Sequence, residues 1–200
     1  MDTQALFNIS YGLYVITAKR EDKDNGCIIN TVTQVTDNPN RLTVAINKAN
    51  LTHDMVLETG KFNISNLTTS TPFSLLEHFG FQTGAKVDKF KDYEWKETSA
   101  NGLLYIPKYS NSYLSCDVIS TLDLETHTLF LADITDAKVL SKEESLTYAY
   151  YHENVKPKAK TEGKKGFRCK ICNYIYEGDT LPDDYICPLC KHGVADFEPI

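Results

Sequence analysis

Residues 167–200 read FRCKICNYIYEGDTLPDDYICPLCKHGVADFEPI and hold four of the six cysteines of the chain. The four form two CxxC pairs, Cys169 with Cys172 and Cys187 with Cys190. Four thiolates in two close pairs suit a tetrahedral site for iron or zinc. Because so short a module buries too little apolar surface to fold unaided, we expect the metal to hold it together.

The residues around these cysteines decide between the two metals. The cysteine pairs are accompanied by Tyr174, Tyr176, Gly178, Asp179, the run 181–185 (LPDDY), Pro188 and the closing run 196–198 (DFE). With them the stretch resembles the rubredoxin-like domains at the ends of rubrerythrins and of some flavin reductases, which implies one mononuclear FeS4 iron site. The stretch departs from that family at Asn173 and Lys191, which stand where glycine is usual after each pair. A structural zinc ribbon for protein contacts, or zinc misloaded in place of iron, is the alternative.

We expect three parts along the chain: a large domain in residues 1–152, a flexible basic linker in 153–166 and the metal domain in 167–200. The linker segment, ENVKPKAKTEGKKG, is rich in lysine, contains proline and glycine, and has no apolar periodicity, which is typical of a solvated tether. Cys27 and Cys116 lie outside the CxxC pairs. We expect both to be small buried side chains, as free cysteines usually are.

The composition limits the partners and the location. Hydrophobic residues make up 42% and charged residues 24% of the chain, as in ordinary globular domains. The formal net charge of −6 disfavours nucleic acid, which binds clusters of Lys and Arg. No apolar run is long enough for a membrane span, and residues 1–10 do not read as a leader. Since paired CxxC motifs are typical of reducing compartments, we expect a cytoplasmic protein.

The first 152 residues read as mainly β. Short runs rich in β-branched and aromatic residues alternate with turn residues, which favours a barrel. These runs are 13–17 (LYVIT), 41–47 (RLTVAIN), 61–67 (KFNISNL), 113–121 (YLSCDVIST) and 128–134 (TLFLADI). Two segments read as helices, 52–58, with Thr52 as a candidate N-cap and Gly60 as its stop, and 72–79, which begins at Pro72.

No GxGxxG and no GxxxxGK[ST] motif occurs, so a nucleotide must bind in some other way. Residues 26–54 read GCIINTVTQVTDNPNRLTVAINKANLTHD, and HFGF (78–81), DKF (88–90) and HTLFLADITDAKVL (from His127) follow in that order. Together these motifs resemble the FMN-binding split-barrel domain of the flavin reductase and flavoredoxin family, from about residue 7 to residue 151. The resemblance implies a split β-barrel with a few helices, a bound FMN and a homodimer.

The resemblance also assigns site residues. It implies contacts to the flavin ring from Asn30, Thr31, Val32, Thr33 and Gln34. It implies contacts to the flavin phosphate from Asn47, Lys48, Thr52 and His53. His127 resembles the histidine that these reductases place beside the flavin, where it either orients NAD(P)H or hydrogen-bonds the reduced flavin. Each assignment has a simpler alternative: the threonines as strand residues, Thr52 as a cap, Lys48 as a solvated turn residue and His127 as a packed histidine.

The two modules together suggest an electron path. NAD(P)H gives up two electrons as hydride, a mononuclear iron site moves one, and a flavin handles both. Fusions of this type resemble the high-molecular-weight rubredoxins, which pass electrons to flavodiiron proteins that reduce oxygen or nitric oxide. We therefore predict an NAD(P)H:flavin/rubredoxin oxidoreductase. The alternative is an FMN and iron carrier without NAD(P)H activity of its own.

Overall fold

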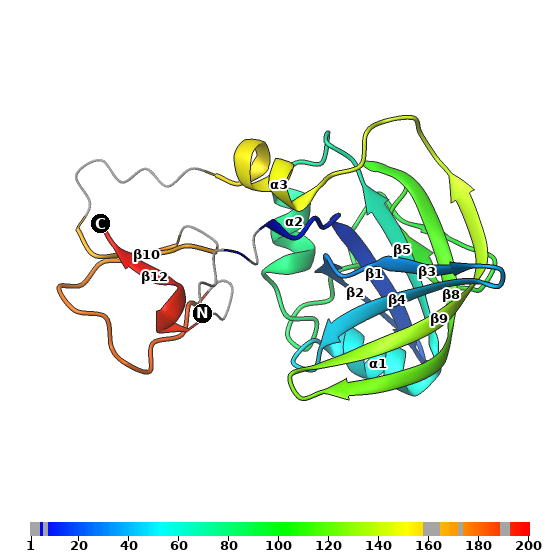
Figure 1. The fold of residues 1–200 in the computed structure, drawn as a ribbon, viewed down its shortest axis with the longest axis horizontal. Coiled ribbons are helices and arrows are strands. Elements are labelled where there is room, and N and C mark those ends of the chain that lie inside the picture. Colours follow the sequence, from blue (N-terminus) through cyan, green and yellow to red (C-terminus); the bar gives the residue numbers. More distant parts are fainter. Residues whose placement is uncertain (1–4, 6–7, 158–164, 172–173, 189–192) are drawn as a thin grey trace. The chain divides into compact units, whose positions relative to one another are not determined.

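The computed structural model describes residues 5, 8–157, 165–171, 174–188 and 193–200. Its contacts divide the chain into two compact units, Met1–Asn154 (the N-terminal unit) and Val155–Ile200 (the C-terminal unit), which are described separately (Figure 1). The first residues of the predicted linker are helical, because a π-helix spans Tyr151–Val155. Residues 158–164 of that segment lie outside the described residues, so a flexible linker stays a prediction.

The N-terminal unit is built on a seven-stranded sheet that curls round into a barrel (Figure 1). All of its strand pairs are antiparallel, in the order β2-β1-β5-β8-β9-β4-β3. The strands are β1 (Tyr14–Arg20), β2 (Lys23–Ile29), β3 (Thr33–Asp37), β4 (Asn40–Asn47), β5 (Lys61–Leu67), β8 (Ser110–Leu124) and β9 (His127–Val139). The prediction of a mainly β fold is confirmed.

The barrel core follows from the alternation of side chains along the strands. In β4, Leu42, Val44 and Ile46 are buried while the residues between them are only partly buried. They meet Phe130 of β9, which pairs with β4 along its length. Cys27 and Cys116 are buried in this core, as predicted, and burial raises the pKa of the Cys116 thiol to about 12.

Two helices pack on strands of the barrel, and a short third helix, α3 (Tyr148–Tyr150), comes directly before the π-helix. α1 (Leu51–Thr59) packs against β1 and β2, and α2 (Phe73–Gly80) packs against β2. α1 ends at Gly60, which adopts the left-handed conformation at φ +67°. The Gly60 N–H donates a hydrogen bond to the Val56 carbonyl. The N-cap prediction was wrong: Asn50 occupies that position, because its carbonyl accepts the first helical hydrogen bond, from His53. None of the helices among the described residues is long and apolar enough to cross a membrane.

A small hairpin is fastened to the barrel by a buried polar network. The hairpin consists of β6 (Glu97–Thr98) and β7 (Leu104–Tyr105). The Asn63 side chain, fully buried on β5, donates from Nδ2 to the Ser99 hydroxyl at 2.8 Å and to the Leu103 carbonyl at 3.0 Å. Its Oδ1 accepts from the Asn101 amide at 2.8 Å. Asn63 is thus a central member of the set of barrel side chains that hold the hairpin, together with Thr17 and Ser115.

We expect Asn63→Ala to lower the free energy of unfolding by about 2–3 kcal/mol, because the buried groups that it pairs would lose their partner. Asn66→Ala on the same strand is the matched control, since Asn66 is only half-buried and its amide makes one 3.2 Å hydrogen bond, to Ser145; the substitution should cost about 1 kcal/mol or less. Chemical denaturation of the two variants measures the difference. Equal losses would contradict the network's role.

The C-terminal unit contains a three-stranded sheet in the order β11-β10-β12. Its strands are β10 (Phe167–Cys169), β11 (Ile175–Tyr176) and β12 (Phe197–Pro199), and a 3-10 helix (Val194–Asp196) precedes the last. The Tyr185 ring packs against Tyr176, with centroids 4.6 Å apart, and against Phe197 at 5.4 Å. The three rings therefore pack together as part of the core of this unit.

Candidate flavin and metal sites

The predicted ring-binding segment, Asn30–Gln34, connects β2 to β3 and runs beside β4. The Thr31 hydroxyl donates to the Ala45 carbonyl at 2.8 Å and accepts from the Ala45 N–H at 3.0 Å, and Val32 packs on the core. Asn30 is half-buried, whereas Thr33 and Gln34 are exposed. Thr31 and Val32 therefore anchor the segment beside β4. The polar side chains of Thr33 and Gln34 are exposed.

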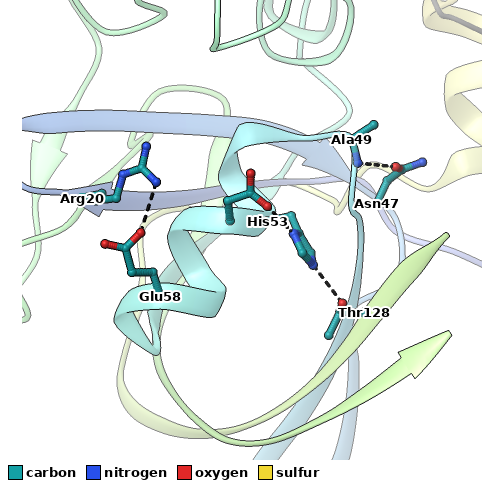
Figure 2. A network of polar contacts seen from close by, with 7 residues as sticks. Arg20, Asn47, Ala49, His53, Glu58 and Thr128 are labelled. Carbon is teal, nitrogen blue, oxygen red and sulfur yellow. Dashed lines mark hydrogen bonds and ion pairs between the residues drawn. The ribbon is translucent and has the colours of Figure 1, made fainter. Parts of the chain in front are cut away.

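The predicted phosphate residues begin at the turn between β4 and α1. The Asn47 Oδ1 accepts from the Ala49 N–H at 2.8 Å, which closes the turn (Figure 2). The Lys48 ammonium lies 2.7 Å from the carboxylate of Asp123, near the end of β8. Asn47 is exposed and Lys48 is half-buried. This turn thus offers one amide and one cation beside the first turn of α1.

Thr52 and His53 lie inside the fold. The Thr52 hydroxyl accepts from the buried Asn25 amide at 2.9 Å. The His53 ring is 5% exposed, and its Nδ1 and Nε2 lie 2.8 Å from Asp54 Oδ1 and from Thr128 Oγ1 (Figure 2). Their side chains are thus engaged within the protein. Contact of these residues with a phosphate stays a prediction, for which the N–H groups of the α1 first turn are suited.

His127 lies beside this turn although it is far from it in sequence. It is the first residue of β9 and pairs with Asn47 of β4 and with Leu124 of β8. The ring is half-buried. Among the described residues only its Nδ1 has a hydrogen-bond partner, the Thr126 hydroxyl at 2.9 Å. Unlike His53, it therefore keeps one ring nitrogen for a ligand.

Several residues that support this region were missed from the sequence. Asp123 and Thr128 hold Lys48 and His53, and Asn25 holds Thr52. Lys89 is buried and donates to the carbonyls of Gly26 and Phe79 at 2.8 and 2.9 Å, and burial lowers the pKa of its ammonium. Its only signal was its place in the DKF motif. Thr128 likewise lay within the motif that begins at His127, whereas Asn25 and Asp123 carry no signal that a single sequence could reveal.

The donor set fits a phosphorylated flavin. A phosphate requires a cation and N–H groups, which Lys48, Asn47 and the first turn of α1 supply. A flavin ring requires amide-type donors and acceptors along an extended backbone, which residues 30–34 supply. The pairing of Thr31 with Ala45, two residues before Asn47, brings the two sets together at the end of β4.

The described half of the metal site also fits its group. Cys169 ends β10 and Cys187 follows Tyr185, and both are fully buried. The Cys169 N–H donates to the Tyr174 carbonyl at 2.8 Å, which closes the loop between them. Buried sulfur ligands from the two CxxC pairs suit a tetrahedral thiolate site. Cys172 and Cys190, and the unusual Asn173 and Lys191, lie outside the described residues.

Comparison with known proteins assigns both units. The flavin reductase like domain family matches residues 6–159, and the rubrerythrin, rubredoxin-like domain family matches residues 167–198. The chain is 39% identical to the high molecular weight rubredoxin of Moorella thermoacetica over 230 aligned residues, which cover all of both chains. It is 39% identical to the ferric-chelate reductase (NAD(P)H) of Archaeoglobus fulgidus over 152 residues, 76% of this chain and 89% of the relative.

A solved structure supports the fold of the N-terminal unit. The flavoredoxin of Methanosarcina acetivorans superposes with a TM-score of 0.59 at 26% identity, over 65% of this chain and 69% of that one. The chain therefore belongs to the flavin reductase-like domain family and carries a rubredoxin-like domain in residues 167–198, which together make it a flavin-linked electron-transfer oxidoreductase.

Proposed function

We propose that the protein takes electrons from NAD(P)H onto FMN, passes them to a rubredoxin-type iron, and delivers them to an acceptor such as a flavodiiron protein. The observation that carries the proposal is the pairing of His127 with Asn47, because it sets a histidine beside the turn that fits the flavin phosphate. The full-length similarity to a high molecular weight rubredoxin supports the combination of both units. The similarity to an NAD(P)H-dependent ferric-chelate reductase supports the nucleotide as the source of electrons.

Each part of the site has a distinct task in this proposal. Lys48, Asn47 and the first turn of α1 bind the phosphate, and residues 30–34 bind the edge of the ring. His127, through the ring nitrogen that Thr126 leaves unpaired, orients the nicotinamide. A bound flavin accepts hydride and passes electrons on singly.

We propose that electrons leave the protein through the C-terminal unit. Cys169, Cys172, Cys187 and Cys190 hold the iron, which exchanges one electron at a time with its partners. We also place the protein in the cytoplasm, because a reducing compartment keeps these thiols available for metal.

Anaerobic mixing of the purified protein with NADH and, separately, with NADPH tests the proposal. The flavin absorbance should bleach first and the ferric-thiolate colour should fade after it. If neither nucleotide bleaches the flavin, the protein is a carrier that another reductase must serve. Metal analysis of protein produced with adequate iron tests whether the C-terminal unit binds iron. If only zinc were found, this unit would be a structural zinc ribbon and would not transfer electrons.

We further propose that the N-terminal unit forms a homodimer. Val35 on β3 and Ile119, Leu122 and Leu124 on β8 are large apolar side chains that are 43–58% exposed. We infer that they contribute to an apolar patch, and such patches on soluble proteins often mark a protein–protein interface. A second copy of the chain is the occupant that the family resemblance implies.

Leu122→Glu is expected to shift the protein from dimer to monomer, because it would place a charge in the apolar interface. Val139→Glu is the matched control, since Val139 is also exposed but pairs with Ser112 at the other end of the β8–β9 ladder. Light scattering after size-exclusion chromatography reports the mass of each variant. A dimer that survives Leu122→Glu would contradict this interface.

A further inference from the structure

Lys48 is fastened to the turn between β8 and β9 through its backbone and its side chain. Its N–H donates to the Thr126 carbonyl at 3.0 Å, and its ammonium donates to Asp123 Oδ1 at 2.7 Å. The same Asp123 oxygen accepts the N–H of Glu125 at 2.7 Å, which fixes the turn where Glu125 adopts φ +63°. One carboxylate oxygen therefore holds both the turn and the ammonium.

This ion pair is exposed, so it contributes little to the stability of the fold. The side chains of Asp123 and Lys48 are 74% and 34% exposed, and such pairs are weak in water. The hydrogen bond from Lys48 nevertheless holds the pKa of the Asp123 carboxyl below its usual value, so Asp123 is anionic at neutral pH. The negative charge of Asp123 therefore lies beside the Lys48 ammonium, which is the cation proposed to bind the phosphate.

The other predicted phosphate residues cannot replace that cation. Asn47 is neutral, the Thr52 hydroxyl is turned toward Asn25, and both ring nitrogens of His53 are engaged. Lys48 thus supplies the side-chain charge that distinguishes a phosphorylated flavin from an unphosphorylated one. A phosphate dianion that reaches Lys48 also comes near the Asp123 carboxylate, which repels it.

We propose that Asp123 is a specificity-determining residue that competes with the flavin phosphate for Lys48 and so limits the preference of the site for FMN over riboflavin. The proposal rests on the proposed function, in which Lys48 binds the phosphate. Its signature is a change in the affinity for FMN with no change in the affinity for riboflavin, which lacks the phosphate. A purely structural role of Asp123 in the turn would change both affinities together.

Asp123→Asn tests this, because asparagine keeps an oxygen for the Glu125 N–H while it removes the charge. Full-length protein loaded with FMN or with riboflavin is diluted serially, and the released flavin is measured by its fluorescence. Asp123→Asn should tighten FMN binding about fivefold at low ionic strength and leave riboflavin binding unchanged. Because the charges are exposed, the gain should fall to about twofold or less at 0.5 M salt.

Asp133→Asn is the matched control, since Asp133 is a half-buried aspartate on β9 whose carboxylate also pairs with one cation, Arg41, at 2.7 Å. It should change neither affinity. Weaker FMN binding in Asp123→Asn, an equal change for both flavins, or an equal gain in Asp133→Asn would each overturn the inference while the wild type still prefers FMN. A wild type without any preference for FMN would overturn the phosphate assignment of Lys48 and the inference with it.

Discussion

Cys187→Ala is expected to lower the iron content of the protein by about tenfold or more and to abolish the ferric-thiolate absorbance, because three thiolates cannot complete a tetrahedral site. The C-terminal unit should then lose its fold, because a module this short needs its metal in addition to packing such as that of the Tyr176, Tyr185 and Phe197 rings. Reduction of the flavin by NAD(P)H should continue, while transfer to the acceptor stops. Metal analysis, absorbance and stopped-flow kinetics measure these three results.

Cys116→Ala is the matched control for this experiment. Cys116 is fully buried in the barrel core on β8, and burial raises the pKa of its thiol, so it is an unreactive packing residue. The variant should lose some stability in the N-terminal unit and keep its full iron content. If Cys187→Ala retained the iron, or if Cys116→Ala lost it, the assignment of the metal ligands would be wrong.

His127→Asn is expected to slow the reduction of the flavin by NAD(P)H about 100-fold, because misplacement of the hydride donor by even a small distance costs that much. The affinity for FMN should change little, since in the proposed site the neighbouring turn binds the phosphate. Rapid anaerobic mixing measures the reduction rate, and dilution of the loaded protein measures the affinity.

His152→Asn, in the π-helix Tyr151–Val155, is the control for the removal of an imidazole. It should leave the reduction rate unchanged. A reduction rate in His127→Asn within about threefold of the wild type would leave His127 as a packing residue at the start of β9 and remove it from the reaction.

The sequence predicted those strands whose side chains alternate or form apolar runs. The run 41–47 became most of β4, because Leu42, Val44 and Ile46 all face the core. β2 was missed because its Asp24-Asn25-Gly26 reads as a turn. In the fold these residues pair along β1, and the buried Asn25 finds its partner in Thr52, 27 positions away. A hydrogen bond between residues this far apart forms only in the tertiary structure, so the local sequence around Asn25 does not reveal it.

The candidate site also contains some residues that the sequence predicted and others that it did not. The residue types around Asn47 and Lys48 suggested an anion site, and the turn before α1 does present them at one place. The partners of these residues could not be foreseen, because the ladder between β4 and β9 brings together residues more than 70 positions apart. The predicted cap at Thr52 failed for a local reason, since Asn50 also suits the start of the helix and lies closer to the end of β4.

The His53 imidazole bridges Asp54 on α1 and Thr128 on β9, and Thr128 directly follows His127. This side chain links the first turn of α1 to the start of β9. In the proposed site, a ligand that shifts the first turn of α1 would therefore also shift His127. Phosphate binding would in this way alter the position of the residue that is proposed to orient the nicotinamide.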